Sequence, residues 1–101
     1  MAKYYNITGE ITQALLTAGE NQKVSSASLT NIHADTKCTV DLYIEKKTIG
    51  KFYLLKAIEL PIGATFLCDI LGFNNSAAGF GLYVKLTKSA SETPTVDVIL
   101  Y

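Results

Sequence analysis

Residues 37–45 carry the pattern that decides the fold, reading Lys-Cys-Thr-Val-Asp-Leu-Tyr-Ile-Glu. One set of alternate positions is apolar, and it consists of Cys38, Val40, Leu42 and Ile44. The intervening positions are mostly polar, and they are Thr39, Asp41, Tyr43 and Glu45. A period of two places successive side chains on opposite faces of a strand, whereas a helix repeats about every 3.6 residues. The stretch therefore predicts a strand with one face in a core and the other toward solvent.

The same alternation returns in residues 82–87 and 95–101. Residues 23–32, 52–60 and 65–71 also favour strands, and 52–60 is apolar in both phases, as in a central or doubly covered strand. In residues 4–17 the β-branched and aromatic side chains favour a strand, although residues 10–16 could form a short helix. Turn-forming residues separate these segments. The sequence thus predicts an antiparallel β-sandwich, Greek-key or jelly-roll-like, of about seven or eight strands.

One turn carries a specific expectation. Leu60-Pro61-Ile62-Gly63 places Pro at the second position and Gly at the fourth, which suits a type I turn. Because Pro cannot donate a ladder hydrogen bond, we expect one strand to end near Leu60 and the next to begin by Thr65.

Bulk composition limits the function classes. A length of 101 residues favours a single domain over 1–101. Basic and acidic residues number nine each, so the chain has no broad attraction for phosphates and nucleic-acid binding is disfavoured. Residues 1–10 lack the apolar core of a signal peptide, and no stretch is long and apolar enough to span a membrane. We expect synthesis and folding in a cytosol, without membrane partners.

Catalytic chemistry finds little support in the residues. His33 is the single histidine and falls in a polar turn, while Cys38 and Cys68 lie in apolar runs that predict buried, reduced and inert thiols. The strand carboxylates occupy mostly solvent-facing positions, and Gly79-Phe80-Gly81 precedes a strand rather than the helix that a phosphate-binding loop requires. The sequence therefore predicts no enzyme, no cofactor and no metal site.

Aromatic residues suggest contact surfaces instead. Tyr43, Tyr83 and Tyr101 fall in the polar phase of their strands, where tyrosine suits either a scattered surface or a subunit-contacting face. Residues 1–9 carry enough apolar surface to act as an N-terminal arm that reaches a neighbouring subunit, although packing on their own domain is the alternative. The irregular segment 72–81 is a further candidate. The predicted interface residues are Tyr4, Tyr5, Ile7, Phe73, Asn74, Asn75, Phe80 and Tyr101.

Three stretches carry a resemblance to a known group of proteins. They are Val-Ser-Ser-Ala-Ser-Leu-Thr-Asn at 24–31, Thr-Val-Asp-Leu-Tyr at 39–43, and Leu-Leu-Lys-Ala-Ile-Glu-Leu-Pro-Ile-Gly-Ala-Thr at 54–65. Their order resembles small β-sandwich virion proteins of tailed bacteriophages, and the resemblance covers roughly Glu10 to Tyr101. The chain departs from that group at Lys46-Lys47, where a longer Gly- and Ser-rich loop is common.

The resemblance implies a structural role in a virion assembled in the host cytoplasm. The chain would act as a homo-oligomer bound to other virion proteins, with a capsid decoration or cement role ahead of a tail, neck or fibre role. A carbohydrate-binding β-sandwich module is the alternative from a different class, although the absence of Trp counts against an aromatic sugar platform.

Overall fold

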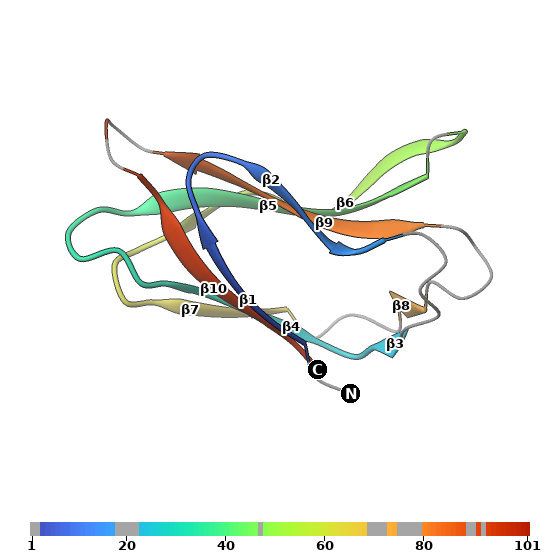
Figure 1. Ribbon diagram of the computed structural model, residues 1–101, viewed down its shortest axis with the longest axis horizontal. Helices are drawn as coiled ribbons and strands as arrows, with labels where there is room; N and C mark the ends of the chain where they lie inside the picture. The colour runs from blue at the N-terminus through green and yellow to red at the C-terminus, as the bar shows by residue number, and fades with distance from the viewer. Residues whose placement is uncertain are drawn as a thin grey trace.

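The computed structural model describes residues 3–17, 23–46, 48–68, 73–74, 80–88, 91 and 93–101. These residues form two facing four-stranded antiparallel sheets and a short two-stranded pair (Figure 1). Sheet A has the order β1-β10-β4-β7, and sheet B has the order β2-β9-β5-β6. The strands are β1 (Lys3–Thr8), β2 (Thr12–Leu16), β3 (Lys23–Val24), β4 (Ala27–Asn31), β5 (Cys38–Lys46), β6 (Gly50–Leu60), β7 (Thr65–Cys68), β8 (Phe73–Asn74), β9 (Gly81–Lys88) and β10 (Thr95–Leu100).

The strand pairs are nested: the first strand pairs with the last, the second with the second to last, and so on toward the middle of the chain. These antiparallel pairs are β1·β10, β2·β9, β3·β8, β4·β7 and β5·β6. The chain is therefore one long hairpin, with its tip between β5 and β6, rolled up so that β4 also pairs with β10 and β5 with β9. This is the arrangement of a jelly roll. The predicted antiparallel β-sandwich is confirmed.

The core lies between the two sheets and uses the predicted alternation. Val40 and Leu42 of β5 are fully buried, and every second residue of β9 and β10 faces the same interior. Burying a large aliphatic side chain contributes about 1.5–3 kcal/mol. Both cysteines are buried thiols rather than a disulfide, as the sequence predicted. The interior positions of β9 and β10, each 0–1% exposed, are Leu82, Val84, Leu86, Val96, Val98 and Leu100.

The turn after β6 confirms one expectation and corrects its detail. Strand β6 ends at Leu60 and β7 begins at Thr65, as predicted. The hydrogen-bonded turn starts one residue later than expected, because the Ala64 amide donates to the Pro61 carbonyl at 3.1 Å. Gly63 then occupies the third position with φ 72°, which is the signature of a type II turn rather than type I.

The N-terminal segment is part of the domain rather than an arm. Lys3–Thr8 pairs along its length with β10, and Ile7 is 3% exposed in the core. The prediction that Ile7 faces a neighbouring subunit is therefore wrong, because its own sandwich covers it. Residues 12–16 form strand β2 instead of the alternative helix.

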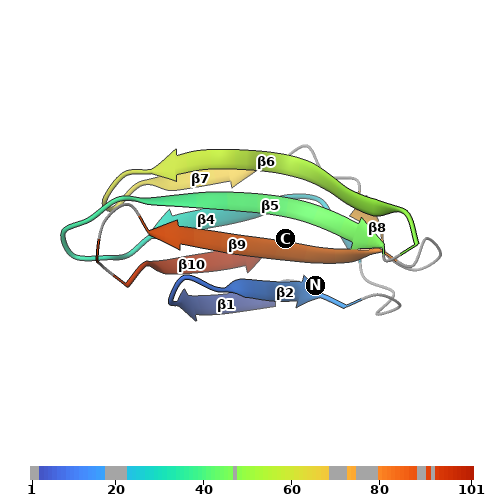
Figure 2. The same ribbon diagram turned by 90° about the horizontal axis from the view of Figure 1, so that it is seen from above.

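Strand β6 also differs from its sequence reading. It is the edge strand of sheet B, not a central one, and the two sheets end in β6 and β7 along the same long side of the molecule (Figure 2). Phe52, in this apolar segment, is 49% exposed. An edge strand lacks a neighbour on one side, so apolar residues in both phases do not guarantee burial on both faces.

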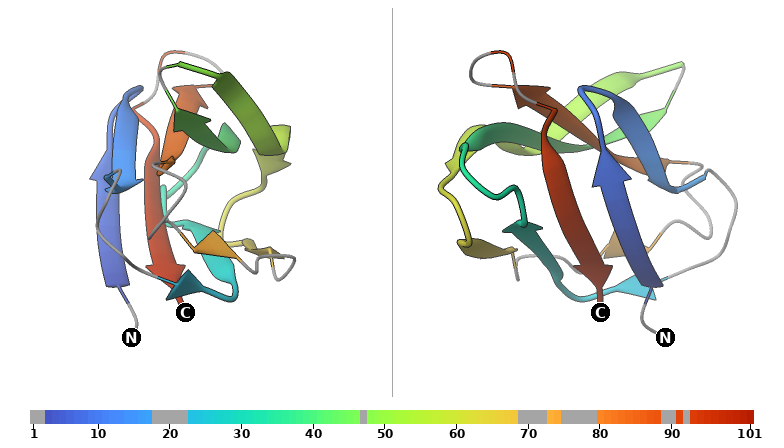
Figure 3. Two further views of the ribbon diagram at one scale, coloured as in Figure 1. Left: turned by 90° about the vertical axis from the view of Figure 1, so that its right-hand side faces the viewer. Right: turned by 60° about the vertical axis from the view of Figure 1, so that its left-hand side comes forward.

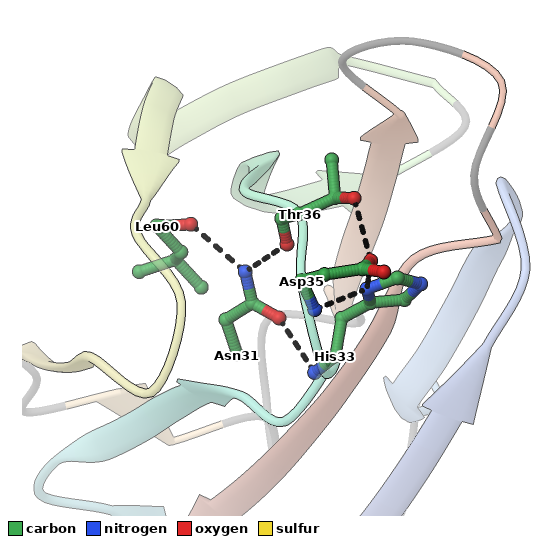
Figure 4. A network of polar contacts seen from close by, with 5 residues as sticks. All are labelled: Asn31, His33, Asp35, Thr36 and Leu60. Carbon is green, nitrogen blue, oxygen red and sulfur yellow. Dashed lines mark hydrogen bonds and ion pairs between the residues drawn. The ribbon is translucent and has the colours of Figure 1, made fainter.

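A buried amide joins three separate segments at one end of the sandwich (Figure 4). Asn31, at the end of β4, is 0% exposed. Its Nδ2 donates to the carbonyls of Leu60 and Thr36, each at 3.0 Å, and its Oδ1 accepts from the His33 amide at 2.9 Å. The network ties the ends of β4 and β6 to the turn that leads into β5.

Candidate functional site

A row of three tyrosines crosses the outer face of sheet B. Tyr43 on β5 stands opposite Tyr53 on β6 and opposite Tyr83 on β9. The ring centroids of Tyr43 and Tyr83 are 5.5 Å apart and nearly parallel, and those of Tyr43 and Tyr53 are 5.2 Å apart and tilted. Such pairs add about 0.5–1.5 kcal/mol beyond area burial. Strand register thus gathers residues that lie 40 positions apart in the sequence.

Two lysines cover the tyrosine row. Lys51 Nζ lies 5.1 Å from the Tyr43 ring centroid, and Lys56 Nζ lies 4.4 Å from that of Tyr53. Both distances are within the range of cation–π attraction. Burial raises the pKa of Tyr43 above its ordinary value, and the nearby Glu45 and Tyr53 act in the same direction, while Lys51 and a hydrogen bond with Thr12 oppose them. Tyr43 is 4% exposed, so its neighbours present the accessible part of the row.

A buried carboxylate shapes the adjoining part of β6. Asp41 Oδ1 accepts the Ala57 amide at 2.6 Å, and Asp41 Oδ2 lies 3.7 Å from Lys56 Nζ. Ala57 has φ 54°, and the register of β6 against β5 shifts between Val40 and Leu42. An extra residue of this kind is a β-bulge, which bends the strand and interrupts its ladder. Asp41 thereby holds the bulge that brings Lys56 beside the tyrosines.

Exposed apolar side chains gather on the same side of the molecule. We call the edge strands β6 and β7, with the turns that flank β6, the β6–β7 side. Among the described residues, nine large hydrophobic side chains are exposed, and five of these belong to the β6–β7 side. They are spread over β6, its two flanking turns and β7, with Ile49 before the start of β6 and Ile62 after its end. The five are Ile49 (58% exposed), Phe52 (49%), Tyr53 (43%), Ile62 (52%) and Leu67 (58%).

The structure disperses the predicted interface residues. Tyr4 is 73% exposed on β1, and Tyr101 is 49% exposed at the end of the chain. Tyr5 is partly buried, and its hydroxyl donates to the carbonyl of Leu15. Phe80 is partly buried and lies 6.0 Å from Phe52, ring to ring.

The irregular segment 72–81 is described only in part. Phe73 and Asn74 form β8, which pairs with β3. Asn75 lies outside the described residues. The predicted contribution of this segment to an interface therefore stays a prediction.

Sequence reasoning missed the exposed residues of β6. The sequence analysis did not predict that Phe52, Tyr53, Lys51 and Lys56 form an exposed surface, because an apolar segment suggested a strand that is covered on both faces. The available signal was that Lys51 and Lys56 occur in a segment that is apolar in both phases, because lysines are typical of edge strands that lack a neighbour.

His33 and Asp35 belong to residue types that can act in catalysis or bind metals, and they pair with each other. His33 Nδ1 lies 3.2 Å from Asp35 Oδ1 within one turn, and the His33 side chain is 21% exposed. Within the described ranges, no three His, Cys, Asp or Glu side chains come together as a metal site. The same part of the chain contains no helix that could cross a membrane.

Comparison with known proteins identifies the fold. No protein-family model matches the sequence, and no curated protein sequence matches it. PirA is similar over 97% of this chain and 92% of its own, with a TM-score of 0.62 and 11% identity. A mitogen derived from Yersinia pseudotuberculosis is similar over 99% of this chain and 84% of its own, with a TM-score of 0.59 and 13% identity. The common feature is the β-sandwich.

A third solved structure shares less of the geometry. The infectious bursal disease virus Gx strain structure has a TM-score of 0.48 and 12% identity, and the match covers 98% of this chain and 32% of that chain. At 11% and 13% identity, the likenesses to PirA and to the mitogen establish architecture alone, because one sandwich fold serves many unrelated functions.

Proposed function

We propose that this protein is a structural component of a bacteriophage virion that works through protein–protein contacts as a homo-oligomer. A capsid decoration or cement role is the first choice, and a tail, neck or fibre accessory role is the second. The observation that carries the proposal is that five of the nine exposed large hydrophobic side chains among the described residues belong to the β6–β7 side.

Charge and composition support contact between copies. The chain has nine basic and nine acidic residues, so copies do not repel one another through net charge. Tyr53 adds an aromatic ring with a hydroxyl, and tyrosine is enriched at the centres of interfaces. Burial of the β6–β7 side would remove apolar surface from water, and this would stabilise an assembly without a catalysed reaction.

The proposed contact packs side chains rather than adding a strand. The ladder between β5 and β6 is irregular both between Val40 and Leu42 and between Leu42 and Tyr43. Bulges and edge lysines are features that protect a sheet edge from pairing with another strand. The side chains of the β6–β7 side, rather than its unpaired backbone, are therefore the surface that a second copy would cover.

Native mass spectrometry and sedimentation of the full chain over a range of concentrations test self-association. The double variant Ile62→Ser/Leu67→Ser removes exposed apolar surface from the β6–β7 side and should shift the protein to monomer. Ile11→Ser is the control, because Ile11 is 44% exposed and directly precedes β2, the edge strand of sheet B opposite to β6. The proposed contact would be contradicted if the wild-type protein stays monomeric, or if the control variant reduces self-association as much as Ile62→Ser/Leu67→Ser does.

The virion role needs its own measurement. Mass spectrometry of purified particles of the phage that encodes this chain should detect it at a copy number comparable with a capsid or tail protein. Electron microscopy would then locate the extra density. Particles that contain none of it would overturn the virion proposal, even if the isolated protein self-associates.

A further inference from the structure

A shallow pocket is lined by residues of β1 and β10. These two strands run side by side at the end of sheet A away from β7 (Figure 3, right). Its volume is about 380 Å³, at the lower end of the range of about 300–1,000 Å³ found for small-molecule sites. The lining residues are Tyr4, Tyr5, Asn6, Asp97, Val98 and Ile99.

The register of β1 and β10 builds this pocket. Tyr4 stands opposite Ile99, and Asn6 stands opposite Asp97. Because side chains alternate along a strand, these four residues share the outer face, whereas the intervening Val98 is fully buried in the core. The pocket therefore has an apolar end and a polar end on one rigid pair of strands.

The polar end consists of an amide and a carboxylate already held together. Asn6 Nδ2 donates to Asp97 Oδ1 at 2.6 Å. An amide offers two N–H donors and an acceptor, and a carboxylate accepts at both oxygens, so each group keeps hydrogen-bonding capacity after this contact. The pair is thus oriented in advance to receive a ligand that both donates and accepts hydrogen bonds.

The apolar end is an exposed aromatic ring. Tyr4 is 73% exposed, the largest exposed fraction among the large hydrophobic side chains described. A purely apolar ligand would desolvate Asp97 without compensation, and an anion would be repelled by its charge. A ligand that fits both ends has an apolar face and an edge of hydroxyl groups.

We propose that this pocket is a saccharide-binding site in which a pyranose ring stacks on Tyr4 and its hydroxyls bind Asn6 and Asp97. Hydroxyls donate to the Asp97 carboxylate, and the free N–H of Asn6 donates to a ring or hydroxyl oxygen. The open shape suits one segment of a longer glycan on a surface. The site lies away from the β6–β7 side and does not depend on the proposed self-association.

Glycan-array binding and saturation-transfer-difference NMR with neutral monosaccharides and oligosaccharides test this site in the full chain. Asp97→Asn keeps the side-chain shape but removes the charge, and it should weaken binding about tenfold or more. Tyr4→Ala should abolish the saturation-transfer-difference signal of the sugar ring protons. Tyr101→Ala is the matched control, because Tyr101 is also exposed and does not line the pocket.

The outcomes separate this proposal from the alternatives. Saccharide binding that Tyr4→Ala and Asp97→Asn weaken and Tyr101→Ala leaves unchanged supports it, with circular dichroism showing that the variants are folded. It is overturned if no saccharide binds, if the three variants behave alike, or if methylammonium occupies the pocket and sugars do not. Unchanged saccharide binding by Ile62→Ser/Leu67→Ser would show that the site is separate from the contact between copies.

Discussion

The carboxylate of Asp41 accepts a hydrogen bond of 2.6 Å from the backbone amide of Ala57, across the pair formed by β5 and β6. Asp41 is 8% exposed even though its position belongs to the outer face of sheet B. Ala57 adopts φ 54°, a conformation that residues other than Gly, Asn and Asp seldom adopt. The hydrogen bond satisfies an amide that the bulge removes from the strand ladder.

Replacement of Asp41 by Ala should therefore destabilise the protein. The variant leaves the Ala57 amide without this partner, at a cost of about 1–3 kcal/mol in the free energy of unfolding. Asp41→Asn keeps an acceptor oxygen and should cost less. Urea denaturation measures both, and Glu59→Gln serves as the control because the Glu59 side chain is 58% exposed. Equal midpoints for Asp41→Ala and the control would refute this role of Asp41.

Gly81 is required by the position of the Tyr83 ring. A Cβ at Gly81 would lie 2.9 Å from Tyr83 Cε1 and 3.0 Å from the carbonyl oxygen of Leu16. Gly81→Ala should lower the free energy of unfolding by about 1–3 kcal/mol, the usual cost of overpacking. In the double variant Gly81→Ala/Tyr83→Ala the loss should be less than the sum of the single losses, because the ring that causes one of the clashes is gone. Additive losses in thermal denaturation would argue against the ring contact.

Asn31 should be the most sensitive polar position described. Asn31→Ala leaves the carbonyls of Leu60 and Thr36 and the amide of His33 without their side-chain partner. Because an unsatisfied buried group costs about 1–3 kcal/mol, we expect a total loss of several kcal/mol. Thr30→Ala removes an exposed hydroxyl contact with Thr65 and should change stability far less. If urea midpoints of the two variants agree, the network does not hold the strand ends together.

Tyr43 should make stability fall at high pH. Its pKa in the folded protein is raised above the ordinary value of 10.0, chiefly by burial. The folded state therefore keeps the Tyr43 proton more tightly than the unfolded chain does. The resulting stabilisation is complete below pH 10.0 and is lost as pH rises through the folded-state pKa.

Absorbance titration of tyrosinate and urea denaturation at a series of pH values check this prediction. Tyr43→Phe should remove a late-ionising component from the titration and flatten the alkaline part of the stability curve. Persistence of both features in the variant would assign them to another tyrosine.

The strands with regular alternation were predictable from the sequence. In β9 and β10 every second residue is apolar, and a single buried face is enough to explain that pattern. In β5 the same apolar phase enters the core, but Asp41 and Tyr43 of the other phase are buried as well. The turn at Pro61 was predictable as well, because proline has no backbone N–H and cannot donate a ladder hydrogen bond in any tertiary fold. Its type was not, because the position of Gly63 within the turn depends on which carbonyl accepts the Ala64 amide.

The candidate surfaces were predictable only in part. Tyr43 and Tyr83 were placed on an outward face from their phase, but their stacking requires β5 to pair with β9 in one particular register. The pairing of Asn6 with Asp97 joins residues 91 positions apart, and no local pattern reveals it. Tyr4 was selected for its exposed apolar surface, yet the pocket beside it arises from the pairing of β1 with β10.

The sequence by itself determined that this chain forms a two-layered β-structure, which side chains of its regular strands enter the core, and where one strand must stop. These properties are local, because they follow from side-chain alternation along a strand and from the chemistry of proline. Tertiary structure decided that β6 is the edge strand of sheet B and that residues 3–8 pair with β10 as an edge strand of sheet A. It also decided which aromatic and polar side chains meet on the surface. These properties depend on strand order and register, which are set by the packing of the whole core rather than by any one segment.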